Sequence, residues 1–228
     1  TQYPVAYSVG GGGNYCSGGS GVTVSLSGSQ GGVLYELRLN GGAITSQSGT
    51  GGPLYFYNVT SAGNYTIVGT QNGCSTTMSG STNVGIYSLP SVYNVYGGGS
   101  YCSGGGGVGV YLSSSQINHS YQLYLNGSPY GGAQSGTGGN MGWGGLTPAG
   151  NYTILATSSV GCQAWMNGSA SISVNPLPNQ YTVGGGGSYC AGGSGVTVSL
   201  SGSQSGVNYY LKIDGVTQGA PAAGNGGA

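Results

Sequence analysis

Charged side chains are so scarce in this sequence of 228 residues that each can be weighed singly as a candidate for chemistry. They are Glu36, Arg38, Lys212 and Asp214, and His119 is the single histidine. Glu36 and Arg38 stand two apart on an expected strand, so they share a face and form a solvated pair worth well under ~1 kcal/mol. No second carboxylate accompanies Glu36 to complete the paired acid and base of a glycosidase.

Nucleophilic catalysis finds no better support. A triad would have to combine His119 with Asp214 from a different copy of the repeat described below, and no Gly-x-Ser-x-Gly motif is present. We expect His119 in a solvent-facing turn. The glycine runs before Cys16, Cys102 and Cys190 lack the lysine and the following helix of a phosphate loop. The sequence therefore predicts no catalytic residue, no metal site, no cofactor and no enzyme.

The overall composition excludes further classes of partner. Charged residues make up 2% of the chain, so it has neither a basic surface for nucleic acid nor a polybasic membrane patch. No apolar run reaches the length of a membrane span. The 54 glycines do not follow the period of three found in collagen. The 20 tyrosines give the chain more apolar surface than a disordered chain usually has.

An internal repeat is the strongest signal in the sequence. The phrase that leads from Tyr7 to Cys16 returns before Cys102 and again before Cys190, at offsets of 86 and 88 residues. Ala62-Gly-Asn-Tyr-Thr-Ile also recurs, at Ala149. We expect three units, namely repeat 1 at residues 1–88, repeat 2 at 89–176 and an incomplete repeat 3 at 177–228. Because repeat 3 stops before its second cysteine, we expect the chain to be a stretch of a longer one.

Within each repeat the hydrophobic period is two. Val22, Val24 and Leu26 alternate with small polar residues, and a later strand reaches the turn Asn40-Gly41, whose residues tolerate positive φ. Residues 78–86 are expected to form one long final strand. Six or seven short strands in fewer than 90 residues predict an all-β protein of immunoglobulin-like antiparallel β-sandwiches.

Two local features refine this prediction. Tyr65 and Tyr152 each follow Ala-Gly-Asn, as in a tyrosine corner, where the phenol hydroxyl bonds nearby backbone; an ordinary strand tyrosine is the alternative. The proline-containing joints at residues 89–91 and 175–179 should be short and stiff, because proline fixes φ.

The five cysteines take equivalent places in the repeats. Cys16 and Cys74 lie 58 residues apart in repeat 1, and Cys102 and Cys162 lie 60 apart in repeat 2. Without co-ligands at zinc-site spacing, the sequence predicts one disulfide within each complete repeat and an unpaired Cys190. Such bonds persist in oxidising surroundings, so we expect a secreted or cell-surface protein.

Several phrases resemble the immunoglobulin-like repeats of large cell-surface adhesins of Bacteroidetes-type bacteria, which are secreted by the type IX route. They are the residues 185–196, 200–209, the Ala-Gly-Asn-Tyr-Thr-Ile phrase and Asn-Pro-Leu-Pro at 175–178. The resemblance covers the whole chain and implies an immunoglobulin-like fold, an extracellular place and a role in adhesion or filament structure. It offers no catalytic residue to carry over.

Aromatic rings and sequons are the remaining candidate sites. Tyr101, Tyr189 and Trp143 are candidate contacts for sugars or for neighbouring protein, although core packing is the alternative. Asn58, Asn126 and Asn167 lie in Asn-x-Ser/Thr sequons and are candidate glycosylation sites.

The leading hypothesis is a structural or adhesive repeat protein of a bacterial cell surface or extracellular filament. Its expected partners are copies of itself or adjacent repeats in a fibre, with surface glycans as a further candidate, and no nucleic acid. The alternative is an array of carbohydrate-binding modules attached to a catalytic domain outside this sequence.

Overall fold

The computed structural model describes residues 2–228, and every regular element in that part of the chain is a β-strand. The first strands are β1 Val9–Gly11, β2 Gly13–Cys16, β3 Val22–Leu26, β4 Leu34–Leu39, β5 Gly42–Ser48, β6 Leu54–Val59, β7 Gly63–Gln71, β8 Cys74–Thr77 and β9 Thr82–Tyr87. They are followed by β10 Val95–Gly97, β11 Gly99–Cys102, β12 Val108–Leu112, β13 His119–Leu125, β14 Ser128–Pro129, β15 Gln134–Ser135, β16 Met141–Leu146, β17 Gly150–Ser158, β18 Gln163–Trp165 and β19 Ala170–Asn175. The last are β20 Val183–Gly185, β21 Val198–Leu200, β22 Asn208–Tyr209, β23 Lys212–Ile213, β24 Val216–Thr217 and β25 Ala222–Ala223.

The chain divides into two compact units. One consists of Thr1–Gly98, Gly109–Gly144 and Gly150–Ser171, and the other of Gly99–Val108, Gly145–Ala149 and Ile172–Ala228. These limits do not follow the repeat boundaries expected from the sequence, which remain predictions.

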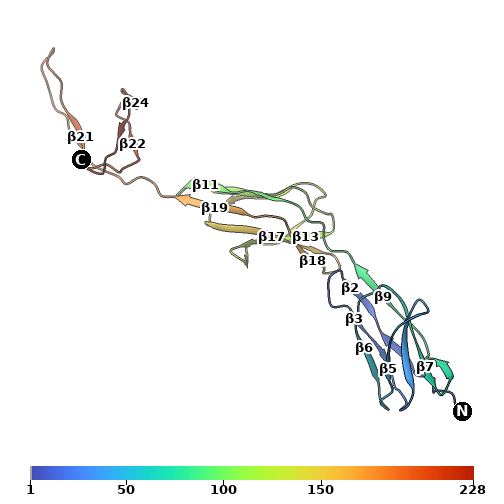
Figure 1. Ribbon diagram of the computed structural model, residues 1–228. Coiled ribbons are helices and arrows are strands. Elements are labelled where there is room, and N and C mark those ends of the chain that lie inside the picture. The colour runs from blue at the N-terminus through green and yellow to red at the C-terminus, as the bar shows by residue number, and fades with distance from the viewer. Residues whose placement is uncertain (1) are drawn as a thin grey trace. The chain divides into compact units, whose positions relative to one another are not determined.

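Strands β1 to β9 form two sheets. One has the order β1-β3-β6, and the other has the order β2-β9-β7-β4-β5 with β8 added beside β7; Figure 1 draws these strands in blue to green. The same two orders recur as β10-β12-β16 and β11-β19-β17-β13-β14. The segment after Asn175 holds three two-stranded sheets, β20-β21, β22-β25 and β23-β24. The recurrence of both sheet orders is the structural counterpart of the sequence repeat.

The hydrophobic core between the first two sheets follows the period-two pattern. Val24 and Leu26 of β3 are fully buried, as are Tyr35 and Leu37 of β4, while the residues between them face outward. Both sheets contribute to one cluster of buried side chains, which also includes Ile67 of β7. Burial of each such side chain contributes about 1.5–3 kcal/mol, so the alternation selects the register of each strand.

The Asn-Gly turn has the predicted backbone. Asn40 and Gly41 have φ of 48° and 88°, and they connect β4 to β5 where Leu39 pairs with Gly42. Two successive residues with positive φ make the tight turn that suits the twist of a hairpin. The Asn40 side chain also accepts a hydrogen bond from the Asn64 backbone N–H at 3.0 Å, so the turn is fastened to β7.

The glycine run before Cys16 moves the chain from one sheet to the other. Strand β1 pairs antiparallel with β3, whereas β2 pairs parallel with β9 in the second sheet. Gly11 and Gly12 connect the two strands with φ of 78° and 73°, which side chains rarely adopt. A Cβ on Gly11 would lie 2.2 Å from the carbonyl oxygen of Thr23. The run is therefore a structural crossing between sheets.

The long final strand expected over residues 78–86 is wrong. Strand β8 ends at Thr77 and β9 begins at Thr82. Gly80 between them has φ of 79°, which breaks the extended backbone, and Ser79 forms an isolated bridge with Ser8. The break lets β8 and β9 both pair with β7, at different positions along it.

Buried tyrosine hydroxyls fix the loops of the sandwich. Tyr65 is fully buried and donates a hydrogen bond to the carbonyl of Ser61 at 2.7 Å, as expected of a tyrosine corner. Tyr152 is buried at the equivalent place. Tyr35 instead accepts a bond from the Gln30 backbone N–H at 2.9 Å. Burial raises the pKa of both the Tyr35 and the Tyr65 hydroxyl, and for Tyr35 the hydrogen bond from the Gln30 N–H partly offsets the rise.

A Ser-Gln pair recurs in the three copies, and its serine hydroxyl donates a hydrogen bond to a loop carbonyl in each. Ser115 is buried, accepts a bond from the Thr137 N–H at 2.9 Å and donates one to the Gly139 carbonyl at 2.7 Å. The neighbouring Gln116 accepts a bond from the backbone N–H of Ser91 at 2.6 Å. The joint at residues 89–91 is therefore hydrogen-bonded to the loop between β12 and β13.

Candidate functional site

One disulfide joins two different copies of the repeat. Cys16 ends β2, and Cys162 lies in the turn between β17 and β18. Their Sγ atoms are bonded, their Cα atoms are 5.6 Å apart, and 146 residues of sequence separate them. In the chain-entropy view, closing a loop of that length removes roughly 5 kcal/mol of unfolded-state entropy.

Local hydrogen bonds hold the turn of Cys162. The Cys162 backbone N–H donates to the Ser158 hydroxyl at 3.0 Å, and the Ser158 N–H donates to the Cys162 carbonyl at 2.8 Å. Gly161, with φ of 87°, supplies the backbone conformation that the turn needs. Cys162 is therefore held in an ordered hairpin, and its side chain is buried.

The disulfides predicted within each repeat are wrong. Neither Cys16 with Cys74 nor Cys102 with Cys162 is bonded, because Cys16 is joined to Cys162. Cys74 and Cys102 are free, and so is Cys190, the cysteine expected to be unpaired. Cys74 is half-buried and the other two are exposed.

The strand registers give the physical reason. Gly13, Val84 and Gly63 lie level with one another on β2, β9 and β7. From that level Cys16 lies three residues along the direction of β9, where it pairs with Tyr87.

Cys74 lies toward the opposite end of the sheet. It pairs with Gln71, eight residues further along β7, which runs antiparallel to β9. About eleven steps of 3.3 Å, or about 36 Å, therefore separate Cys16 from Cys74, whereas a disulfide needs Cα atoms within about 7 Å. The two cysteines of one repeat lie at opposite ends of its sheet.

The aromatic candidates fall into different environments. Trp143 is only 8% exposed, so it belongs to the core, and its indole Nε1 is buried without a hydrogen-bond partner. Tyr101 is half-buried and donates its hydroxyl proton to the Thr147 carbonyl. Tyr189, at 62% exposed, presents its ring to solvent. Of the three, Tyr189 alone has the open ring face that a sugar contact requires.

Other rings make the exposed aromatic pairs. Tyr55 and Tyr57 alternate along β6 and stack with centroids 6.0 Å apart, and Tyr57 is 68% exposed. Tyr96 of β10 faces Tyr111 of β12 directly across the ladder, and their centroids are 5.4 Å apart. This second pair does not follow from the sequence, because cross-strand partners depend on the strand register, which the repeat alone does not give.

The exposed Trp165 makes a third aromatic contact. Its ring lies edge-on to Tyr124 with centroids 4.8 Å apart. These are the described rings that combine exposure with a defined partner, and stacked or edge-on pairs are worth about 0.5–1.5 kcal/mol beyond area burial.

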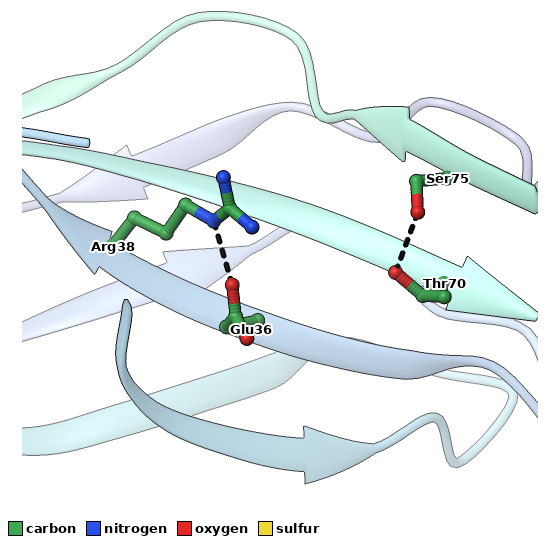
Figure 2. Close-up of polar contacts among 4 residues, drawn as sticks. All are labelled: Glu36, Arg38, Thr70 and Ser75. Atoms are coloured by element: carbon green, nitrogen blue, oxygen red, sulfur yellow. Dashed lines mark hydrogen bonds and ion pairs between the residues drawn. The ribbon is translucent and has the colours of Figure 1, made fainter. Parts of the chain in front are cut away.

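The ion pair forms as expected. The Arg38 Nε lies 2.6 Å from a carboxylate oxygen of Glu36 on the outer face of β4 (Figure 2). On the neighbouring β7 and β8, the hydroxyls of Thr70 and Ser75 are 2.9 Å apart (Figure 2). Both charged side chains are more than a third exposed, so solvent screens the pair and its contribution is small.

His119 lies at the start of β13, and its Nδ1 is 3.1 Å from the carbonyl oxygen of Ile117. Over residues 2–228, His, Cys, Asp and Glu form no group of three that could hold a metal ion. Asn58, Asn126 and Asn167 are all exposed, which leaves their glycosylation a prediction.

No family model matches the sequence, and no curated protein matches it either. Among solved structures, a Ca²⁺-stabilized adhesin with which an Antarctic bacterium binds ice matches at 15% identity and a TM-score of 0.43, over 80% of this chain and 52% of that one. Fibronectin(III)-like modules of CbhA from Clostridium thermocellum match at 13% identity and 0.40, over 74% of this chain and 95% of theirs. A marsupial T cell receptor matches at 12% identity and 0.47, over 78% and 76%.

The fold is all-β, and its two-sheet sandwich is immunoglobulin-like. The two sheets, the buried Tyr65 with its hydroxyl on upstream backbone, and the sandwich core agree with that class. Within residues 2–228, no helix has the length and apolar character to cross a membrane.

Proposed function

We propose that this chain is a structural or adhesive repeat protein of a bacterial cell surface or an extracellular filament. The observation that carries the proposal is the Cys16–Cys162 disulfide, which ties one copy of the repeat to the next. A bond of this kind limits how far neighbouring copies can separate, which a load-bearing array needs and a soluble enzyme does not. The phrases shared with surface adhesins secreted by the type IX route support the bacterial setting.

The composition supports the same function. The formal net charge is zero, with two basic and two acidic residues, so copies of the chain do not repel one another. Lateral or end-to-end association is therefore electrostatically permitted. Disulfides persist in oxidising compartments, which supports a place outside the cytoplasm. The repeats of this proposal are residues 1–88, 89–176 and 177–228, and its partners are copies of the chain or adjacent repeats.

Imaging under native conditions tests the proposal. We expect negative-stain electron microscopy and size-exclusion chromatography of oxidised protein from its source to show extended assemblies. Isolated monomers at every concentration would rule out the filament. A surface protein without filaments would instead be labelled on intact cells by a membrane-impermeant amine or tyrosine reagent.

Carbohydrate binding is the second candidate, and the exposed Tyr55–Tyr57 pair is the observation that favours it. A stacked pair of open rings supplies contact area for a sugar face at low entropy cost. Tyr57→Ala should abolish glycan-array signals if this function holds. Tyr3→Ala is the matched control, because Tyr3 is exposed to 67% against 68% for Tyr57. Absence of any array signal from the unaltered chain would exclude this candidate.

A further inference from the structure

The free cysteines occupy the same backbone positions as the bonded ones. Cys102 ends β11 and pairs with Asn175 in a parallel ladder, as Cys16 ends β2 and pairs with Tyr87. The carbonyl of Cys102 accepts a bond from the N–H three residues on at 2.9 Å, and the carbonyls of Cys16 and Cys190 do the same at 2.9 Å. These three are called the first cysteines of their repeats.

Cys74 is the counterpart of Cys162. Cys74 closes the hairpin between β7 and β8, where it pairs with Gln71, and Cys162 closes the hairpin between β17 and β18. These two are called the second cysteines. The observed bond thus joins a first cysteine to the second cysteine of the following repeat.

We propose that this bond recurs from repeat to repeat as a disulfide ladder. Cys74 then bonds the first cysteine of a preceding repeat, and Cys102 bonds the second cysteine of a following repeat. The inference deepens the proposed structural function and rests on it, since it names the covalent partner as a further repeat of the same kind, in a longer chain or in a second copy.

The strand geometry excludes a disulfide between the two cysteines of one repeat and is compatible with the ladder. Cys16 and Cys74 are about 36 Å apart along the strands, so the two cysteines of a repeat face different neighbours. Cys102 is exposed and Cys74 is half-buried, so both can be reached by a partner from outside the repeat. The ladder partner of each free cysteine would lie outside residues 1–228, whereas both partners of the observed bond lie within them.

The chemistry is an ordinary two-electron oxidation. A thiolate of Cys74 or Cys102 attacks one sulfur of glutathione disulfide and releases one glutathione thiolate. The partner thiolate then attacks the mixed disulfide and releases the second glutathione. One S–S bond forms, one is lost, two thiol protons pass to solvent and thence to glutathione, and two glutathione thiols are the reduced product.

The first experiment tests a second copy as the source of the partner. One variant of the full chain, Cys74→Ser, keeps the first cysteines, and another, Cys102→Ser with Cys190→Ser, keeps the second cysteine of repeat 1. Each is incubated alone and both are mixed in a glutathione redox buffer, then alkylated and run on a non-reducing gel. We expect a disulfide-linked dimer in the mixture and monomers in each variant alone.

The second experiment tests a contiguous repeat. The full chain is extended at its N-terminus by a second copy of residues 1–176, oxidised, alkylated and digested without reduction. We expect a linked Cys102–Cys74 peptide from nearly every molecule. Cys102→Ser in the added copy should reduce that peptide by at least about tenfold, while Cys102→Ser in the original copy should leave it unchanged.

Linkage in either experiment supports the ladder and identifies its source. No linkage in both, a Cys74–Cys74 dimer, or a Cys16–Cys74 peptide would overturn it. The Cys16–Cys162 peptide is the internal control for folding and oxidation in every sample. Assemblies that form although neither experiment gives a linkage would overturn the ladder and leave the structural function standing.

Discussion

Replacing the buried Ser115 by alanine should destabilise repeat 2 although no apolar contact is lost. The hydroxyl accepts from the Thr137 N–H at 2.9 Å and donates to the Gly139 carbonyl at 2.7 Å. Each hydrogen bond of this kind contributes about 0.5–1.5 kcal/mol net, so the pair contributes about 2 kcal/mol. With a urea m-value of about 2 kcal/mol per M, Ser115→Ala should lower the unfolding midpoint by about 1 M.

Tryptophan emission is the suitable assay, because Trp143 is buried in the same part of the fold and its emission shifts to the red when that core opens. Ser173→Ala is the matched control. The Ser173 hydroxyl makes one exposed contact of 2.6 Å with Ser100, so its loss should change stability by no more than about 0.5 kcal/mol. Equal midpoints for the two variants would refute the reasoning.

Two further changes probe the backbone crossing and the buried phenols. Gly11→Ala should cost at least about 2 kcal/mol in urea unfolding, because its Cβ would lie 2.2 Å from backbone, whereas Gly31→Ala meets nothing and should cost less than about 0.5 kcal/mol. Burial raises the pKa of Tyr35 and Tyr121, so folding stability should fall as pH rises above about 10, where these groups ionise in the unfolded chain only. Absorbance at 295 nm that showed every tyrosine titrating before the loss of circular dichroism would contradict this.

The strands and turns follow from local physics and were predictable. Alternation at Val24 and Leu26 fixes which face is buried, and Asn40-Gly41 fixes a hairpin, since both signals act over a few residues. The corner at Tyr65 was also predictable from its neighbours. The break at Gly80 was not predictable, because the alternation of apolar and polar residues continues through it. Its positive φ allows β8 and β9 to pair with β7 at two different places, and that pairing is not visible in the local sequence.

The pairing of the cysteines could not be predicted from their spacing in the sequence. The similar separations of 58 and 60 residues in the two repeats suggested internal bonds, but spacing does not tell at which end of a sheet a residue lies. The parallel pairing of β2 with β9 decides that for Cys16, and it depends on the crossing at Gly11 and Gly12. The Ser-Gln pair at Ser115 and its counterparts was a signal that could have been used, since two polar residues recur next to buried strands.

The Cys16–Cys162 bond also changes how tension travels along the chain. When the chain is pulled from both ends, the force passes through the disulfide from Cys16 directly to Cys162. The residues between these two cysteines then carry no load. Without the bond, this stretch, with a sequence separation of 146, would reach a length of about 500 Å when fully extended. The strands β3 to β17 can therefore unfold and refold without lengthening the molecule. Its maximum extension depends on whether this disulfide is formed, and it takes the shorter value only under oxidising conditions.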